Sequence, residues 1–280
     1  MESTSSTAGV KNRSMRDLKR LRVLKIDEEH QKHIEDEVVV EEPLEIRVNG
    51  ESLSVTMRTP GNDFDLAIGL LFTEGIIRSR DEIGTIAYCP DEDQPELKNV
   101  VNVVLTEPGR RIESSRRLWS NSSCGLCGKA TLDAIRRACQ PVQSAMSVTH
   151  AFLYALPSRL RDAQANFERS GGIHAVALFD APGSLLVLRE DIGRHNAVDK
   201  VVGAALMGGF LRSEAVMMVS GRLGFEIAQK ALIAGIPIVA SISAPSSLAV
   251  ELADDFGMTA IGFLRGHSMN VYSHPERVTV

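Results

Sequence analysis

In residues 214–264, EAVMMVSGRLGFEIAQKALIAGIPIVASISAPSSLAVELADDFGMTAIGFL, short apolar runs alternate with longer amphipathic segments. The apolar runs are residues 214–220, 236–243 and 258–264. Strands that read as continuous apolar runs are typical of a parallel sheet with helices on both faces. The segments between them have the length and composition of helices. The sequence therefore predicts an α/β fold around a parallel sheet.

Three loops follow the carboxyl ends of these predicted strands: SGRLG (220–224), SAPSS (243–247) and FLRGHS (263–268). Parallel strands place such loops at one edge of the sheet, where open α/β folds bind ligands. For any single loop, glycine and serine are better interpreted as helix caps and turn residues. Three loops at one edge nevertheless favour a ligand that bears phosphate, since helix N-termini leave backbone N–H groups free.

Specific side chains at this edge fit such a ligand. Ser220, Gly221 and Arg222 of the first loop are predicted to bind the ligand. Arg222 and Arg265 could pair with phosphate through their forked donors. Phe263 and His267 could stack on a base.

The segment REDIGRHNAVDK (189–200) is denser in polar groups than an exposed helix start requires. In one interpretation Asp191 caps the helix, and Arg194 with Asp199 forms surface pairs of little energetic value. In the other, His195 lines the same cleft with Arg194 and Asn196 and could act as a general acid or base. His174, which opens a predicted strand, is interpreted as structural.

The N-terminal part predicts a small ββαββ-like unit. Alternating apolar residues on either side of Asn49-Gly50 predict a hairpin, a helix begins at Asn62 or Asp63, and two more strands follow. The helix should end at Gly75. Cys89, within one of the later strands, is expected to be a small buried residue. The predicted division of the chain is a flexible tail (1–35), a β-rich domain (36–118), a mobile loop (119–130) and an α/β domain (131–280).

Composition excludes several classes of protein. The 280-residue chain has a formal net charge of −5, which argues against non-specific binding of nucleic acid. No apolar run reaches membrane-spanning or signal-peptide length, and four cysteines do not make a disulfide framework. We therefore expect a cytoplasmic protein with reduced thiols, no nucleic-acid partner and no membrane association.

Two of the cysteines, Cys124 and Cys127, form a CxxC motif in the stretch NSSCGLCGKA (121–130). A structural zinc site needs about four ligands, and neither a second CxxC nor a suitable histidine spacing supplies the remainder. A helix that follows the pair, with Lys129 nearby, would favour the thiolate form. Such a thiolate can exchange disulfides or carry a sulfane sulfur as a persulfide, and the residues alone leave both open. Cys139 is expected to be a small buried hydrophobic residue.

An ordered set of segments resembles the formate dehydrogenase accessory sulfurtransferase family, the FdhD-type proteins. The segments are EEPLEIRVNG, RTPGNDFDLAIGLLFTEGII, SCGLCGK, GGIHAVALF, EDIGRHNAVDKV, SGRLGFEI, APSSLAVELA and GFLRG. They cover nearly all of the chain after the first 35 residues.

The resemblance implies a sulfurtransferase that formate dehydrogenase requires for activity. It would accept sulfur from a cysteine desulfurase as a persulfide on Cys124, with Cys127 assisting. It would then deliver the sulfur to the bis-molybdopterin guanine dinucleotide cofactor, with molybdenum or tungsten, before insertion into the formate dehydrogenase apoenzyme. The cofactor is the bound substrate, and no catalytic metal belongs to the protein itself.

The resemblance also implies where the cofactor binds. The guanine dinucleotide would contact six consecutive residues: Phe263, Leu264, Arg265, Gly266, His267 and Ser268. It further implies a homodimer, and a cytidine-deaminase-like αβα fold without zinc ligands in the C-terminal domain. Two alternatives stay open: a non-catalytic molybdenum-cofactor chaperone, and a dithiol redox or zinc module.

Overall fold

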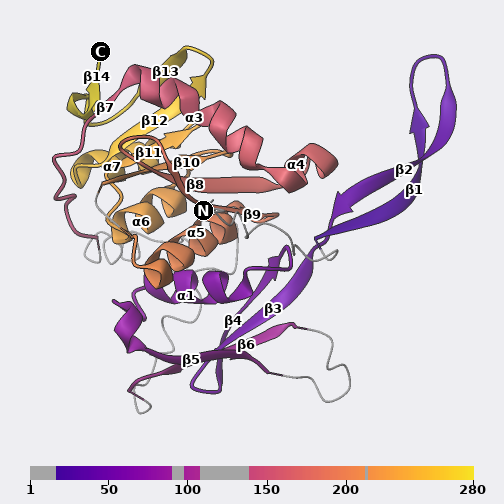
Figure 1. Ribbon diagram of the computed structural model, residues 1–280, viewed down its shortest axis with the longest axis horizontal. Helices are drawn as coiled ribbons and strands as arrows, with labels where there is room; N and C mark the ends of the chain where they lie inside the picture. The colour runs from indigo at the N-terminus through magenta and orange to yellow at the C-terminus, as the bar shows by residue number, and fades with distance from the viewer. Residues whose placement is uncertain (1–16, 90–97, 108–138, 212–213) are drawn as a thin grey trace, which may run out of the picture.

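The computed structural model describes residues 17–89, 98–107, 139–211 and 214–280 (Figure 1). In this part of the chain a four-stranded sheet and a six-stranded sheet lie on opposite sides of a layer of helices. A separate two-stranded ribbon projects from the body at the N-terminal end (Figure 1). The mixed α/β class predicted from the sequence is confirmed.

The N-terminal elements form the projecting ribbon, which consists of the first two strands, and a β-rich unit around one helix. They are β1 (Leu18–Ile26), β2 (Gln31–Val39), β3 (Glu42–Val48), β4 (Glu51–Arg58), α1 (Asp63–Thr73), the 3₁₀ turn η1 (Arg80–Glu82), β5 (Ile83–Tyr88) and β6 (Val100–Leu105). The sheet has the order β4-β3-β6-β5, with β3 and β6 parallel. Asn49 and Gly50 both have positive φ, at 52° and 85°, so the hairpin turn predicted from this dipeptide is confirmed.

The C-terminal elements form the larger sheet and its helices. They are β7 (Val148–Thr149), α3 (His150–Ala163), α4 (Ala165–Ser170), β8 (His174–Asp180), β9 (Leu185–Asp191), α5 (Arg194–Gly208), β10 (Ala215–Val219), α6 (Phe225–Ile233), β11 (Ile238–Ser241), α7 (Ser247–Asp255), β12 (Thr259–Arg265), β13 (Ser268–Val271), the 3₁₀ turn η3 (Pro275–Arg277) and β14 (Val278–Thr279).

The larger sheet has the order β13-β12-β11-β10-β8-β9. Strands β10, β11 and β12 are parallel, as predicted, whereas β8, β9 and β13 run antiparallel to their neighbours. One face packs against α5, α6 and α7, and the other against α3. This double cover explains the unbroken apolar runs: Met217 contributes to one core and Met218 to the other.

Helices α1 and α5 hold the two halves of the molecule together through glycines. A Cβ atom added at Gly69 of α1 would lie 1.8 Å from the backbone oxygen of Asp199. One added at Gly203 of α5 would lie 2.0 Å from the backbone oxygen of Asp65. The helix backbones therefore approach more closely than any larger residue would allow.

Residues 18–35, predicted to belong to a flexible tail, form most of the β1–β2 ribbon instead. Its turn is closed by Asp27, whose carboxylate accepts hydrogen bonds from the backbone N–H groups of Glu29 and His30. Across the ribbon Arg20 pairs with Glu37, which also pairs with Arg169 of α4 at 2.7 Å. These two arginines lower the pKa of Glu37 to about 2.

The interpretation of Asp199 as a surface residue paired with Arg194 is wrong. Asp199 is 2% exposed, because α1 covers this part of α5. Its carboxylate accepts hydrogen bonds from Lys230 Nζ at 2.9 Å and from Thr73 Oγ1 at 2.7 Å. The residue is thus part of a buried ion pair between α5 and α6.

Among the helices that the structure describes, none is long and apolar enough to cross a membrane.

Candidate functional site

The three predicted loops do meet at one edge of the sheet. The backbone N–H of Leu223 donates to the oxygen of Ala244 at 3.2 Å, which joins the loops after β10 and β11. The N–H of Phe263 donates to the oxygen of Ser243 at 3.1 Å, which joins the loop after β11 to the end of β12. The edge is therefore one continuous surface, built by the carboxyl ends of the three parallel strands.

Residues 263–268, called the 263–268 turn below, comprise the end of β12, the turn at Gly266 and His267, and the first residue of β13 at this edge. The pairing of the two strands is irregular between Gly262 and Arg265, and Phe263 has a positive φ of 53°. This conformation is uncommon for a bulky residue, and such outliers cluster at ligand-binding sites. Phe263 is 40% exposed, whereas Leu264 is fully buried.

The remaining residues of this turn differ in how they present their side chains. Arg265 is exposed, and its Nε donates to the backbone oxygen of Ile242 at 2.9 Å. This bond holds the guanidinium against the loop after β11. His267 lies edge-on to Tyr154 of α3, with ring centroids 5.5 Å apart. Gly266, with φ 53°, makes the turn, and Ser268 is exposed. Of the six predicted contacts, Leu264 is the one whose side chain cannot reach a ligand at the surface.

The loop after β10 contains the other predicted contacts. Ser220 Oγ accepts from the N–H of Ala175 at 2.9 Å, and the oxygen of Gly221 accepts from Ser241 Oγ at 2.7 Å. These bonds fix the loop against its neighbouring strands. Arg222 is exposed. Its position at the edge agrees with the predicted role, although Arg222 belongs to a different loop from Arg265.

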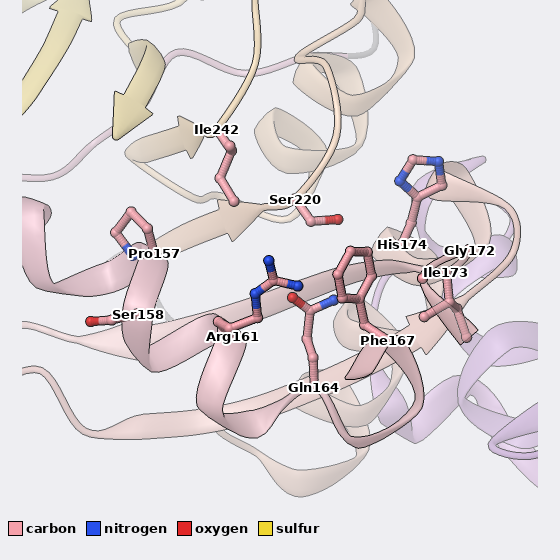
Figure 2. Close-up of a pocket in the computed structure, with 11 residues that line it drawn as sticks. Pro157, Ser158, Arg161, Gln164, Phe167, Gly172, Ile173, His174, Ser220 and Ile242 are labelled. Atoms are coloured by element: carbon pink, nitrogen blue, oxygen red, sulfur yellow. The ribbon is translucent and has the colours of Figure 1, made fainter. Parts of the chain in front are cut away.

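A cavity of about 660 Å³ opens at the same edge, between α3 and α4 on one side and the ends of the strands on the other (Figure 2). Its lining residues are Pro157, Ser158, Arg161, Gln164, Phe167, Gly171, Gly172, Ile173, His174, Ser220 and Ile242. Ser220 is the only one of the predicted binding residues in this lining. The cavity nevertheless adjoins the 263–268 turn, because Ile242 lines it and also accepts the hydrogen bond from Arg265.

Sequence reasoning missed Arg161 and Gln164, which face this cavity from the end of α3 and the junction with α4. Both residues look like ordinary exposed residues at the end of a helix. Only the packing of α3 across the sheet brings them to the strand ends, so no local sequence signal could have found them. His174, interpreted as structural, also lines the cavity; burial, followed by the nearby Arg194 and His195, lowers its pKa.

The segment 189–200 makes a buried polar network at the start of α5. Asp191 does not cap this helix, which corrects that interpretation: the N-cap residue is Gly193, and Asp191 Oδ1 accepts from the backbone N–H of Gly193, at 2.8 Å, ahead of the first turn. It is also fully buried and pairs with Lys200 Nζ at 2.7 Å. Asn196 donates to Asp191 and to the backbone oxygen of Met57, so it joins α5 to β4. Asn196 therefore has a structural task.

His195 forms a half-exposed pair with Glu226, in which Nε2 and Oε2 are 2.9 Å apart. The hydrogen bond from His195 lowers the pKa of Glu226. The dyad could transfer a proton, but neither residue lines the cavity of Figure 2, and neither do Arg194 and Asn196. The role of His195 as a general acid or base stays a prediction.

Cys124, Cys127 and the predicted loop 119–130 lie outside the described residues. Cys139 is 4% exposed, as expected, and burial raises the pKa of its thiol to about 11. Cys89 follows β5 and is only partly buried, which corrects the expectation for that residue. Within the described part of the chain, no three His, Cys, Asp or Glu side chains are grouped so that they could hold a metal ion.

Comparisons with known proteins agree on one family. The model of the FdhD/NarQ family matches residues 39–279. The sulfur carrier protein FdhD of Streptomyces coelicolor is 52% identical over 254 residues, which cover 88% of this chain and 90% of that protein. The protein of the same name from Mycobacterium tuberculosis is 48% identical over 253 residues, covering 86% and 91%.

A solved structure has the same fold. It is the crystal structure of a protein described as a candidate formate dehydrogenase accessory protein from Desulfotalea psychrophila. The superposition gives a TM-score of 0.76 and covers 94% of this chain and 99% of that one, with 24% sequence identity. At this identity the likeness concerns the fold.

Proposed function

The chain belongs to the FdhD/NarQ family, and from that premise we propose that it is a sulfurtransferase that formate dehydrogenase requires for activity. It takes sulfur from a cysteine desulfurase and delivers it to the bis-molybdopterin guanine dinucleotide cofactor before the cofactor enters the formate dehydrogenase apoenzyme. The observation that carries this proposal is the identity of about half the residues, over most of the chain, with relatives named sulfur carrier protein FdhD.

The sulfur is carried on Cys124. Its thiolate attacks the terminal sulfur of the donor's persulfide, so that the donor's S–S bond breaks as a new S–S bond forms on Cys124. The donor leaves as a thiolate, and the step needs no net oxidation or reduction. Cys127, two residues further on, assists the transfer. Cys139 is unsuited to this role because its buried thiol stays protonated.

The 263–268 turn receives the guanine dinucleotide part of the cofactor. Its exposed Phe263 ring offers a face on which a base can stack, and Arg265 offers forked donors to a phosphate. Arg222, on the neighbouring loop, adds a second positive charge. The molybdenum or tungsten arrives with the cofactor as substrate, and the protein contributes no catalytic metal. We further propose that the protein acts in the cytoplasm as a homodimer.

Two variants test the proposal in cells that make formate dehydrogenase but lack their own accessory protein. Cys124→Ala should abolish formate dehydrogenase activity while its Tm stays at the wild-type value. The matched control is Cys89→Ala, which removes a partly buried cysteine and should leave the activity intact. Normal activity with Cys124→Ala would refute the carrier role and favour a non-catalytic chaperone.

Nucleotide binding is tested separately by titration calorimetry with GDP. Arg265→Ala should weaken binding about tenfold or more, because it removes a charge-assisted contact to phosphate. Unchanged affinity would remove Arg265 from the proposed site. Stoichiometric zinc in the purified protein, with no sulfur transfer, would favour the zinc module instead.

A further inference from the structure

The cavity between α3, α4 and the strand ends is rich in donors and contains no acid. Its polar lining includes Arg161, Gln164, His174 and Ser220, and none of its lining residues is Asp or Glu. The two acids at the end of β9 are already engaged. Glu190 accepts from the backbone N–H groups of Asn166 and Phe167 at the start of α4, and Asp191 pairs with Lys200. The cavity therefore presents positive charge and hydrogen-bond donors to whatever enters it.

Gln164 shows that one of these donors lacks its partner. The residue is 4% exposed, and its side-chain Nε2 has no hydrogen-bond partner among the described residues. A buried amide without a partner costs stability, and such groups in folded proteins call for a specific explanation. Figure 2 shows the amide beside the Arg161 guanidinium, on the wall of the cavity. A ligand that brings an acceptor atom would complete this site.

Arg161 and Ser220 are placed to serve the same ligand. The Arg161 guanidinium lies over the Phe167 ring, 4.4 Å from its centroid, so the stack holds its plane while the edge donors stay available. Arg161 has no acidic partner in the described part of the chain. Ser220 Oγ already accepts from Ala175 N–H at 2.9 Å, which leaves its proton to donate to an acceptor.

We propose that this cavity binds a phosphate-bearing group, with Arg161 pairing with the anion while Gln164 and Ser220 donate hydrogen bonds to it. The shared chemistry fits two sources. One is the diphosphate of the guanine nucleotide, which can reach both the cavity and the 263–268 turn because Ile242 lines the cavity and its backbone oxygen accepts from Arg265. The other is free inorganic phosphate or pyrophosphate. The first source rests on the proposed function, and the second is independent of it.

Titration calorimetry on the full chain tests the site with GDP, guanosine and pyrophosphate as probes. Arg161→Met keeps an unbranched chain against Phe167 but removes the charge, and it should weaken pyrophosphate binding roughly 10- to 100-fold. Gln164→Leu removes the unpaired donor with little change in shape. It should weaken binding about tenfold while the Tm of the unliganded protein stays level or rises.

The matched control is Arg159→Met. It removes the same charge from α3 two residues away, where Arg159 donates to the backbone oxygen of Gly183 outside this cavity. Its affinity for pyrophosphate should equal that of the wild type. If Arg161→Met and Gln164→Leu also bind pyrophosphate and GDP like the wild type, the cavity is not a phosphate site and the inference is overturned.

The probes also separate the two sources. If GDP binds more tightly than pyrophosphate, and both Arg161→Met and Arg265→Ala lose this tighter binding, the ligand is the guanine nucleotide. If GDP and pyrophosphate bind with equal affinity, and only Arg161→Met loses that binding, the ligand is the free anion. The cavity is then a phosphate site, and the proposed nucleotide site at 263–268 is refuted. If GDP affinity depends on Arg265 but not on Arg161, the nucleotide site stands and the cavity inference fails.

Discussion

Replacing Gly69 by alanine should destabilise the protein, although alanine is the better helix former. The added Cβ would lie 1.8 Å from the backbone oxygen of Asp199, whereas real Cβ contacts below 3.0 Å are essentially never seen. The obstacle is backbone, which no rotamer change can remove. Helices α1 and α5 must therefore separate by more than about 1 Å, and the contact between the two halves of the molecule loosens.

Two opposing contributions set the size of the expected loss in stability. Alanine gains about 1 kcal/mol over glycine inside a helix. Overpacking of a well-packed core costs about 1–3 kcal/mol and occasionally more, and a forced shift of two helices belongs at the upper end or beyond. We expect a net loss of about 2 kcal/mol, which corresponds to a fall in Tm of roughly 4–8 °C.

Thermal unfolding followed by circular dichroism measures this change. The control is Gly172→Ala, where the new Cβ meets nothing closer than 3.7 Å and the backbone φ is not positive. Its Tm should lie within about 2 °C of the wild type. A Gly69→Ala variant as stable as the wild type would show that α1 and α5 are not in close backbone contact.

Three further predictions follow from buried ionisable groups. Lys230→Met leaves the Asp199 carboxylate buried without its partner and should lower the free energy of unfolding by about 3–5 kcal/mol. The double variant Lys230→Met with Asp199→Leu should recover most of that loss, as urea unfolding can measure. With a pKa of about 11, only about one Cys139 thiol in a thousand is ionised at pH 8. Iodoacetamide should therefore label the partly exposed Cys89 before Cys139 in the folded protein, as peptide mass spectrometry can show. Burial, followed by the positive charges at the start of α5, lowers the pKa of His174 below 6.5, so near this pH the unfolded chain binds a proton more readily than the folded one. The stability of the protein should therefore fall as the pH drops through about 6.5. His174→Gln should flatten that part of the Tm–pH curve.

The parts of the fold that were predictable depend on local signals. Asn49-Gly50 predicts its hairpin because only a few residues adopt positive φ readily, and this preference acts within the turn itself. The apolar runs around Met217 and Val239 predict strands covered on both faces, because double burial leaves no polar side to alternate with. The meeting of three loops at one edge then follows from parallel connection alone.

The parts that were missed depend on packing between distant segments. Asp199 looks like a surface residue, yet α1, more than a hundred positions earlier, covers it. The β1–β2 ribbon was missed because Leu21 and Val23 stand among charges without clear alternation, and cross-strand pairs such as Arg20 with Glu37 only emerge once the strands pair. Gln164 belongs to a cavity that exists only after α3 has packed on the sheet.

Peptide mass spectrometry after sulfur loading shows directly whether Cys124 carries sulfur. The full chain is incubated without oxygen with a cysteine desulfurase and cysteine, then alkylated and digested. We expect one additional sulfur atom on the peptide that contains Cys124, in the wild type and in Cys127→Ala, and none in Cys124→Ala. No additional sulfur on that peptide, under conditions in which the desulfurase loads a small thiol acceptor, would show that Cys124 is not the sulfur carrier.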